Sequence, residues 1–220
     1  MATFDPETGG LIIHLIYDGS PEAGKTESIR ALGHHLGREV VTPEEDDKGR
    51  TLYFDWMDYA GGLRMGRPIQ CRVVAVPGQL AYRDRRQVIL AAADAVVFVV
   101  DSTRLGFEAS ARQFADLQES LSLYPREVPI IVQLNKLDKA DALEVAYMHA
   151  VLDAPGVRKR TETVAINGAG VRETFVFAVG EALRAMDTAE NLYRTPGEYE
   201  TLEMKLPDPQ ELRHILERNS

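Results

Sequence analysis

One eight-residue segment near the N-terminus constrains the fold of this chain more than any other feature. The segment Gly19-Ser-Pro-Glu-Ala-Gly-Lys-Thr26 matches the phosphate-loop pattern G-x4-G-K-[ST] in full. It lies between an apolar stretch at 11–17 and a stretch of helical periodicity at 26–36, which is the context that the pattern requires. A glycine-containing turn that matched the pattern by chance would have no reason to lie between a strand and a helix. The segment therefore predicts a strand, a phosphate-binding loop and a helix whose N-terminal amides face the phosphates.

The hydrophobic pattern of the remaining chain extends this α/β interpretation. The stretches 95–101 and 128–134 are apolar almost throughout, as expected for parallel strands that are covered on both faces. Residues 51–58 are aromatic and alternating, which favours an edge or antiparallel strand joined to 67–76 by a turn at Ala60-Gly-Gly. Helices are expected at 26–36, 83–92, 107–124, 140–152 and 171–187. This order predicts a doubly wound, mostly parallel sheet with one antiparallel edge strand.

The domain organisation expected from this pattern is simple. Residues 1–187 form one domain, and 188–220 form a linker followed by a short amphipathic helix at 209–219. That C-terminal appendage either folds back on the domain or docks on a partner, and the sequence does not choose between the two.

Charge and cysteine content exclude several classes of function. The formal net charge is −9, which disfavours nucleic acid and anionic membranes as partners because both attract basic surfaces. The single cysteine, Cys71, cannot form an intrachain disulfide, so a reducing cytoplasm is the expected compartment. We expect no direct membrane anchor, because the N-terminus lacks a signal-like apolar run and the C-terminus lacks a cysteine for prenylation.

A second motif predicts the base of the ligand. Asn135-Lys-Leu-Asp138 follows the apolar stretch 128–134, at the sheet edge where α/β proteins bind ligands. The Asp138 carboxylate can accept hydrogen bonds from N1–H and the exocyclic amine of guanine, whereas adenine would leave it poorly paired. Asn135 is expected to reach the other ring edge, and the Lys136 stem to lie along the base. N-K-x-D alone is a weak signal, but together with the phosphate loop it predicts selection of GTP.

Together these motifs resemble the Ras-like small GTPases and, within them, the bacterial MglA family, which governs polarity in motile bacteria. The resemblance implies a Mg²⁺·GTP switch that recruits effector proteins in its GTP form. It also implies a Roadblock-type, MglB-like partner that stimulates hydrolysis. The resemblance spans residues 11–187 and rests on the phosphate loop, Arg50-Thr-Leu-Tyr-Phe-Asp55, Val76-Pro-Gly-Gln79, the segment 128–138, Ala165 and Gly170-Val171.

The resemblance assigns roles to individual residues. Thr51 matches the switch I threonine that ligates Mg²⁺ and senses the γ-phosphate, and Gln79 lies in switch II, where it orients the attacking water. Arg50 matches the intrinsic arginine finger of the family, although a solvated loop charge is its alternative interpretation. The backbone N–H of Ala165 is expected to reach guanine O6. In the loop, Lys25 bridges the β- and γ-phosphates and Thr26 ligates Mg²⁺. The remaining nucleotide contacts fall to Gly19, Glu22, Ala23, Gly24 and Glu27 in and beside the loop, and to Gly78 before Gln79.

Several positions depart from the Ras-like pattern. Ala75 replaces the aspartate that usually holds a Mg²⁺-bound water, a loss that the MglA family shares. Asp55 is a candidate substitute through water, with a strand carboxylate as its alternative interpretation. Pro21 stands where glycine is usual and removes an N–H from the loop, and Glu22 adds negative charge beside the phosphates. Nucleotide binding is still expected, and the hydrolysis rate stays open.

Two rival functions remain after these departures are weighed. One is a pseudo-GTPase adaptor, which binds guanine nucleotide as a structural ligand with little or no hydrolysis. Ala75, Pro21 and Glu22 favour it, whereas the presence of Arg50, Thr51 and Gln79 opposes it. The other is a phosphate-loop kinase or ATPase, which the N-K-x-D motif disfavours. The favoured prediction is a slow small GTPase that a partner stimulates.

Overall fold

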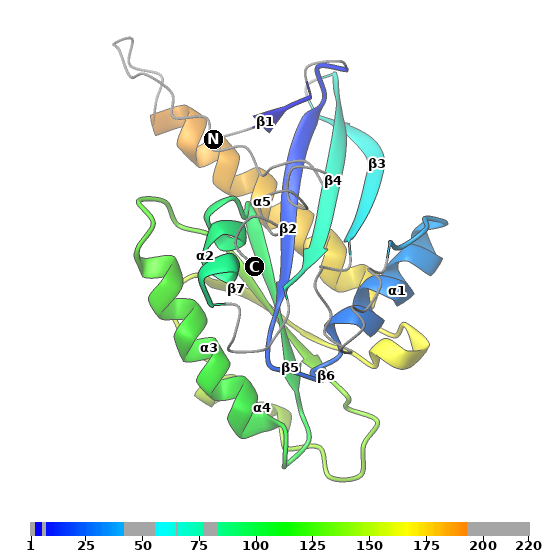
Figure 1. Cartoon of the computed structure of the whole chain (residues 1–220), viewed down its shortest axis with the longest axis vertical. Coiled ribbons are helices and arrows are strands. Elements are labelled where there is room, and N and C mark those ends of the chain that lie inside the picture. Colours follow the sequence, from blue (N-terminus) through cyan, green and yellow to red (C-terminus); the bar gives the residue numbers. More distant parts are fainter. Residues whose placement is uncertain (1–2, 6–7, 42–55, 65, 77–82, 193–220) are drawn as a thin grey trace.

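One mixed sheet forms the centre of the protein in a computed structural model that describes residues 3–5, 8–41, 56–64, 66–76 and 83–192 (Figure 1). The strand order is β3-β4-β2-β5-β6-β7, with the short β1 paired to β2. The strands are β1 (Thr3–Phe4), β2 (Leu11–Asp18), β3 (Trp56–Arg64), β4 (Arg67–Ala75), β5 (Ala95–Asp101), β6 (Ile130–Asn135) and β7 (Val157–Glu162). The helices are α1 (Lys25–Leu36), α2 (Arg83–Ala91), α3 (Phe107–Ser122), α4 (Val145–Val151), the 3-10 turn η2 (Ala165–Asn167) and α5 (Val171–Leu192).

Strand pairing confirms the predicted fold class. β2 pairs in parallel with β4 and β5, and β5, β6 and β7 continue the parallel pairing. β3 is antiparallel to β4 at the edge of the sheet, as predicted, but it spans Trp56–Arg64 rather than 51–58, and residues 51–55 lie outside the described part of the chain. β1 adds a second, two-residue antiparallel pairing against Leu11 and Ile12 of β2. The connections between parallel strands run through helices, as a doubly wound sheet requires.

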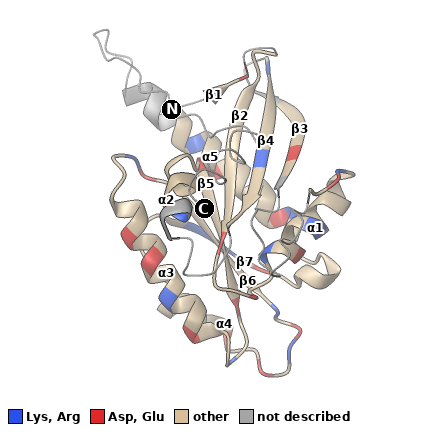
Figure 2. Ribbon diagram, viewed as in Figure 1, with Lys and Arg blue, Asp and Glu red and all other residues tan. Residues whose placement is uncertain are grey.

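Helices cover both faces of the sheet, and alternate strand residues divide between two cores. Leu15, Tyr17 and Val97 pack with α1 and α5 on one face. Ile16 and Phe98 pack with α2, α3 and α4 on the other face. This two-sided burial explains why β5 and β6 are largely apolar before their polar last residues, Asp101 and Asn135, and Figure 2 accordingly shows few charges along the central strands.

The predicted turn at Ala60-Gly-Gly is wrong. These residues lie within β3, where the pairing register with β4 shifts between Ala60 and Leu63. Gly62 has a φ of 84°, so the glycines accommodate a bulge inside the strand. The two strands join instead across residues 65–66, between the paired Arg64 and Arg67, and Gly66 has a φ of 77° there.

Two helices differ in length from the expectation. α4 begins only at Val145, because residues before it bridge back to the end of β5 through Thr103 and Ala142. α5 continues to Leu192, five residues beyond the domain boundary expected at 187. That boundary stays a prediction, because the expected linker and terminal helix lie outside the described residues from 193 onward.

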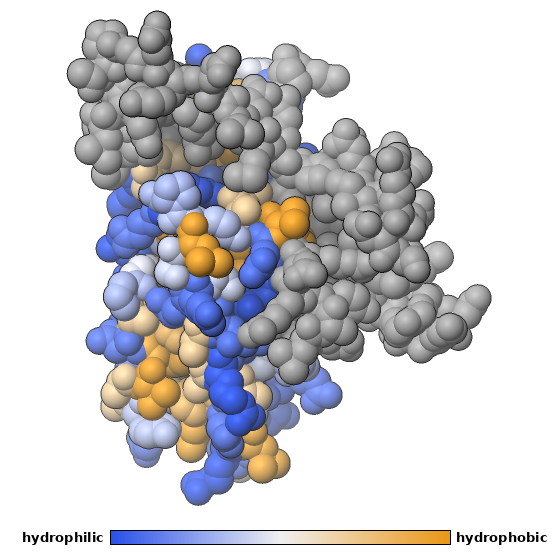
Figure 3. Space-filling view, turned by 60° about the vertical axis from the view of Figure 1, so that its left-hand side comes forward, coloured by the Kyte–Doolittle hydropathy of each residue, from blue (hydrophilic) through white to orange (hydrophobic). Residues whose placement is uncertain are grey.

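The surface of the helical layer carries isolated apolar side chains. Val88, Leu105 and Leu123 are the most exposed large apolar residues near α2 and α3. Figure 3 shows this side of the molecule, where apolar groups alternate with hydrophilic ones. Scattered exposed apolar residues are ordinary on folded domains. None of the described helices combines the length and the apolar character needed to cross a lipid bilayer.

The packing of α3 generates a stability prediction. Leu117 is fully buried between α3 and the sheet, whereas Leu123 at the end of the same helix is 69% exposed. Leu117→Ala should lower the free energy of unfolding by about 2–5 kcal/mol, because it removes buried methyl groups and leaves a cavity. Leu123→Ala is the matched control and should change it by less than about 0.5 kcal/mol. Urea unfolding measures both values, and equal losses would contradict this placement of α3.

Candidate functional site

The predicted motifs converge on the edge formed by the carboxyl ends of the parallel strands. The phosphate loop connects the end of β2 to the start of α1. Asp101 ends β5 and Asn135 ends β6, and Thr163 follows β7 on the same edge. Ligands of open α/β sheets bind at this edge, where successive strands present polar side chains to a common space. The fold thus places a candidate site where the two motifs meet.

The phosphate loop has a backbone that only glycine tolerates at its ends. Gly19 has a φ of 145° and Gly24 a φ of 101°. A Cβ added to Gly19 would lie 2.2 Å from the carbonyl oxygen of Val99, and one added to Gly24 would lie 2.3 Å from Nδ2 of Asn135. Glu22 adopts a φ of 61° within the loop. The loop is therefore pressed against β5 and Asn135, which fixes its curvature.

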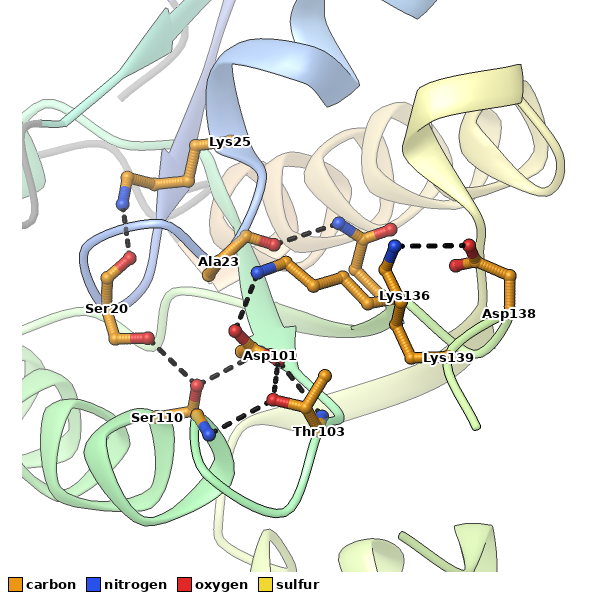
Figure 4. A network of polar contacts seen from close by, with 11 residues as sticks. Ser20, Ala23, Lys25, Asp101, Thr103, Ser110, Lys136, Asp138 and Lys139 are labelled. Atoms are coloured by element: carbon orange, nitrogen blue, oxygen red, sulfur yellow. Dashed lines mark hydrogen bonds and ion pairs between the residues drawn. The ribbon is translucent and has the colours of Figure 1, made fainter. Parts of the chain in front are cut away.

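Lys25 is held across the phosphate loop by backbone carbonyls. Its ammonium Nζ donates to the carbonyl oxygens of Gly19 and Ser20, at 2.8 Å each, and the residue is only 8% exposed (Figure 4). Gly24 is the N-cap of α1, and no side chain of the described residues caps it by a hydrogen bond. A cation and a helix N-terminus without a side-chain cap form an environment that fits an anionic ligand, as the sequence predicts.

Three further residues of the loop and of the first turn of α1 are exposed. Pro21 and Glu22 are exposed, and the Glu27 carboxylate pairs with Arg30 at 2.9 Å on the surface of α1. A contact of Glu27 with nucleotide would therefore use its backbone amide. Thr26 stands in the first turn of α1, as the expected Mg²⁺ ligand must.

Asn135 connects the two motifs inside the protein. Its Nδ2 donates to the carbonyl oxygen of Ala23 at 2.8 Å, across 112 residues of sequence. Its Oδ1 accepts hydrogen bonds from the hydroxyl of Thr163 at 3.2 Å and from the backbone N–H of Ala165 at 2.9 Å. Asn135 is 2% exposed, so this amide joins the phosphate loop, β6 and η2. The predicted contacts of Asn135 and Ala165 with guanine stay predictions, and the structure adds this connecting role.

A carboxylate that sequence analysis missed holds the second lysine of the site. Asp101 Oδ2 accepts a hydrogen bond from Lys136 Nζ at 2.7 Å, and Oδ1 accepts from the hydroxyl of Thr103 at 2.7 Å. Burial alone would raise the pKa of Asp101, but the bonds from Lys136 and Thr103 outweigh it and hold the pKa below its usual value. Asp101 thus stays ionised and fixes the Lys136 ammonium.

The same network reaches the phosphate loop through α3. The Ser110 hydroxyl accepts from the backbone N–H of Asp101 at 3.0 Å and lies 2.9 Å from the Ser20 hydroxyl (Figure 4). Ser20 and Ser110 are almost fully buried. The sequence signal for this network is the polar triplet Asp101-Ser-Thr103 directly after an apolar strand.

Asp138 lies outside this network, on the side away from Lys25 in Figure 4. In the view of Figure 4, Ala23 and Lys136 lie between these two residues. The Asp138 side chain is 38% exposed, and Lys139 Nζ stands 3.9 Å from its Oδ2. An accessible carboxylate at one end and a buried cation at the other suit an elongated ligand with a base and a phosphate tail.

The catalytic candidates lie outside the described residues. This holds for Arg50, Thr51, Asp55, Gly78 and Gln79, whose predicted roles stay predictions. Ala75 is described; it ends β4 opposite Tyr17 and is buried, so its methyl group offers no ligand for a metal. Among the residues that the structure places, no three His, Cys, Asp or Glu side chains group as a metal site. The expected Mg²⁺ ligands combine Thr26 with residues in the undescribed segment 42–55.

Comparison with known proteins identifies the family. The ADP-ribosylation factor family matches residues 65–180, which is more than half of the chain. The mutual gliding-motility protein MglA of Myxococcus xanthus (strain DK1622) is 28% identical over 166 residues, covering 73% of this chain and 85% of that protein. The family match begins after the phosphate loop, so the loop geometry supports it independently. The chain therefore belongs to the ADP-ribosylation factor family and is a Ras-like small GTPase of the MglA type.

Proposed function

We propose that this chain is a Mg²⁺-dependent switch that binds GTP, hydrolyses it slowly and recruits effector proteins in its GTP form. The observation that carries the proposal is the hydrogen bond from Asn135 to Ala23. It joins the N-K-x-D segment to the phosphate loop, so that one ligand with a guanine base and a phosphate tail fits both. The similarity to MglA favours a role in cell polarity or motility in the cytoplasm.

The residues of the site divide the binding of Mg²⁺·GTP between them. Lys25 neutralises the β- and γ-phosphates, while amides of the loop and of the first turn of α1 donate to their oxygens. Thr26 and Thr51 would provide ligands for Mg²⁺, and Asp55 would contribute through a water. When bound, Mg²⁺ supplies positive charge to the phosphate oxygens and orients them. Asp138 reads the base, and Asp101 holds Lys136 beside it.

Hydrolysis depends on residues from the two switch segments. Gln79 orients the attacking water, and Arg50 stabilises the charge that develops on the phosphates. Because Arg50 comes from the chain itself, a Roadblock-type, MglB-like partner needs only to hold the switch segments in their active arrangement. Turnover is slow without that partner, because both side chains must be ordered at once.

A pseudo-GTPase adaptor is the alternative, and particular residues favour it. Ala75 carries no metal ligand at the end of β4, and the phosphate loop bears the exposed residues Pro21 and Glu22 in place of the usual glycine and an uncharged neighbour. Such a protein would bind guanine nucleotide through the same Lys25 and Asp138 contacts. It would differ only in leaving GTP intact.

The base contact gives a prediction of changed specificity. Asp138→Asn should weaken binding of GTP on the order of 10²-fold to 10⁴-fold, because two hydrogen bonds to a charged acceptor are lost. The same variant should gain affinity for xanthosine triphosphate, whose carbonyl suits the new amide. Competition titration with a fluorescent nucleotide measures both affinities. Asp141→Asn, an exposed neighbour, is the control and should bind GTP as the wild type does.

The phosphate and metal contacts give a second prediction. Thr26→Ala should weaken Mg²⁺-dependent binding of GTP at least about tenfold, because a direct metal ligand is lost. The domain should stay folded, because the hydroxyl is not part of either core. Titration of GTP with and without Mg²⁺ measures the change. Unaltered Mg²⁺ dependence in the variant would rule out the metal role of Thr26.

The cis-arginine mechanism gives a third prediction. Arg50→Ala should slow partner-stimulated hydrolysis by about 10³-fold or more, because an arginine finger contributes on that scale. Gln79→Leu should have a comparable effect, and both variants should retain nearly the wild-type affinity for GTP. Single-turnover release of phosphate with a Roadblock-type dimer measures the rates. Hydrolysis by Arg50→Ala at the wild-type rate would exclude the intrinsic finger.

Pro21→Gly separates the proposed GTPase from the pseudo-GTPase alternative. If proline blocks the reaction, the glycine variant should hydrolyse GTP while the wild type does not. If the wild type already hydrolyses GTP, as we expect, the glycine variant should change the rate of an activity that is already present.

A further inference from the structure

A buried ion pair connects the strand before the phosphate loop to α2. The Arg86 guanidinium donates from Nη2 to Asp18 Oδ2 at 2.6 Å, and its Nε lies 3.1–3.2 Å from both carboxylate oxygens. The Asp18 side chain is fully buried and that of Arg86 is 8% exposed. Asp18 ends β2, and Arg86 lies in the first turn of α2. None of the motifs considered above includes either residue.

The pair continues directly into the phosphate loop. Asp18 Oδ1 also accepts the backbone N–H of Gly19 at 2.8 Å. The carbonyl oxygen of that same glycine accepts from Lys25 Nζ at 2.8 Å. An unbroken series of contacts thus runs from Arg86 through Asp18 and Gly19 to the lysine that faces the phosphates.

The ion pair is better suited to fixing the orientation of α2 than to stabilising the fold. Removing two charges from water costs much of what their attraction returns, so a buried pair is a weak stabiliser compared with apolar packing. The planar guanidinium, however, pairs side-on with a carboxylate in a narrow range of orientations. A feature of this kind fixes α2 in one position against the end of β2.

We propose that Asp18 and Arg86 are positioning residues for GTP hydrolysis. Gln79 lies seven positions before Arg86 in the sequence, in the segment that leads into α2. The pair anchors the first turn of α2, the helix that follows this segment in the sequence, to Asp18 and Gly19 at the start of the phosphate loop, so its loss should slow hydrolysis more than it weakens binding. This inference rests on the proposed function, because it assumes that the chain hydrolyses GTP.

Two variants test the proposal in complementary ways. Arg86→Lys retains the positive charge but removes the guanidinium fork. The double variant Asp18→Asn/Arg86→Gln replaces the ion pair with neutral amides of similar size and leaves no unpaired buried charge. Arg112→Lys is the matched control, because Arg112 pairs with Glu108 on the exposed surface of α3. Each protein is assayed for thermal unfolding, affinity for a fluorescent GTP analogue and single-turnover GTP hydrolysis with Mg²⁺.

We expect both test variants to hydrolyse GTP at least tenfold more slowly than the wild type, with affinity for the analogue within threefold. Arg112→Lys should match the wild type in every assay. If Arg86→Lys does not fold, the double variant decides, and failure of both to fold would make the pair purely structural and overturn the proposal. The proposal would also be overturned if the test variants hydrolysed GTP at the wild-type rate, or if their hydrolysis rate fell only as much as their affinity for the analogue.

The wild-type measurements distinguish this inference from the proposed function. A wild-type chain that binds the analogue but hydrolyses no GTP would refute the hydrolytic part of the proposed function and this inference with it. If the wild type hydrolyses GTP and the two test variants hydrolyse it equally fast, only the inference about Asp18 and Arg86 is refuted.

Discussion

The buried amide of Asn135 is the interaction on which the site depends. A buried amide must satisfy its donors and acceptors within the protein, and Asn135 does so with Ala23 on one side and with Thr163 and Ala165 on the other. These partners come from two segments far apart in the sequence: the phosphate loop and the short stretch 163–165 that follows β7. Their distance in the sequence means that the site exists only when the sheet has formed. Binding at the site therefore depends on the folded sheet.

Two charged networks are built around the loop that this amide positions. Asp101 holds Lys136 on the side of the N-K-x-D segment, and Asp18 holds Arg86 on the side of α2. Each carboxylate ends a parallel strand, where the backbone leaves the apolar core. Each pairs with a cation from a different element, so the charges are paired where they are least hydrated. The site thus combines a rigid glycine-framed loop with cations whose positions are fixed by buried acids.

The sequence predicts the parts of this arrangement that are determined by short, continuous stretches of residues. The phosphate loop, the apolar β2 and the N-K-x-D segment follow from spacing and residue type, and the structure places the loop and the N-K-x-D segment at the carboxyl ends of β2 and β6 in the same sheet. β7 was missed because its sequence Val-Arg-Lys-Arg-Thr-Glu is mostly charged, and only Thr161 of this edge strand is buried. The turn at Ala60-Gly-Gly was predicted wrongly because glycine pairs favour both turns and bulges, and only strand pairing separates them.

Long-range polar contacts are the parts that the sequence could not reveal. Asp18 and Arg86 are 68 residues apart, and nothing in either local pattern indicates the other. The visible signal was only a charged residue that ends an apolar strand, as it was for Asp101. The roles of Arg50 and Gln79 come from family resemblance and stay predictions, because these residues lie outside the described part of the chain.

The nucleotide that the purified protein retains, and its fate with time, tests the central claim most directly. Chromatography of the ligand released on denaturation identifies it, and a time course with added GTP and Mg²⁺ follows its conversion. The account predicts that guanine nucleotide is retained and that added GTP is converted slowly to GDP and phosphate. Retention of adenine nucleotide, or GTP that remains intact over many hours, would contradict it.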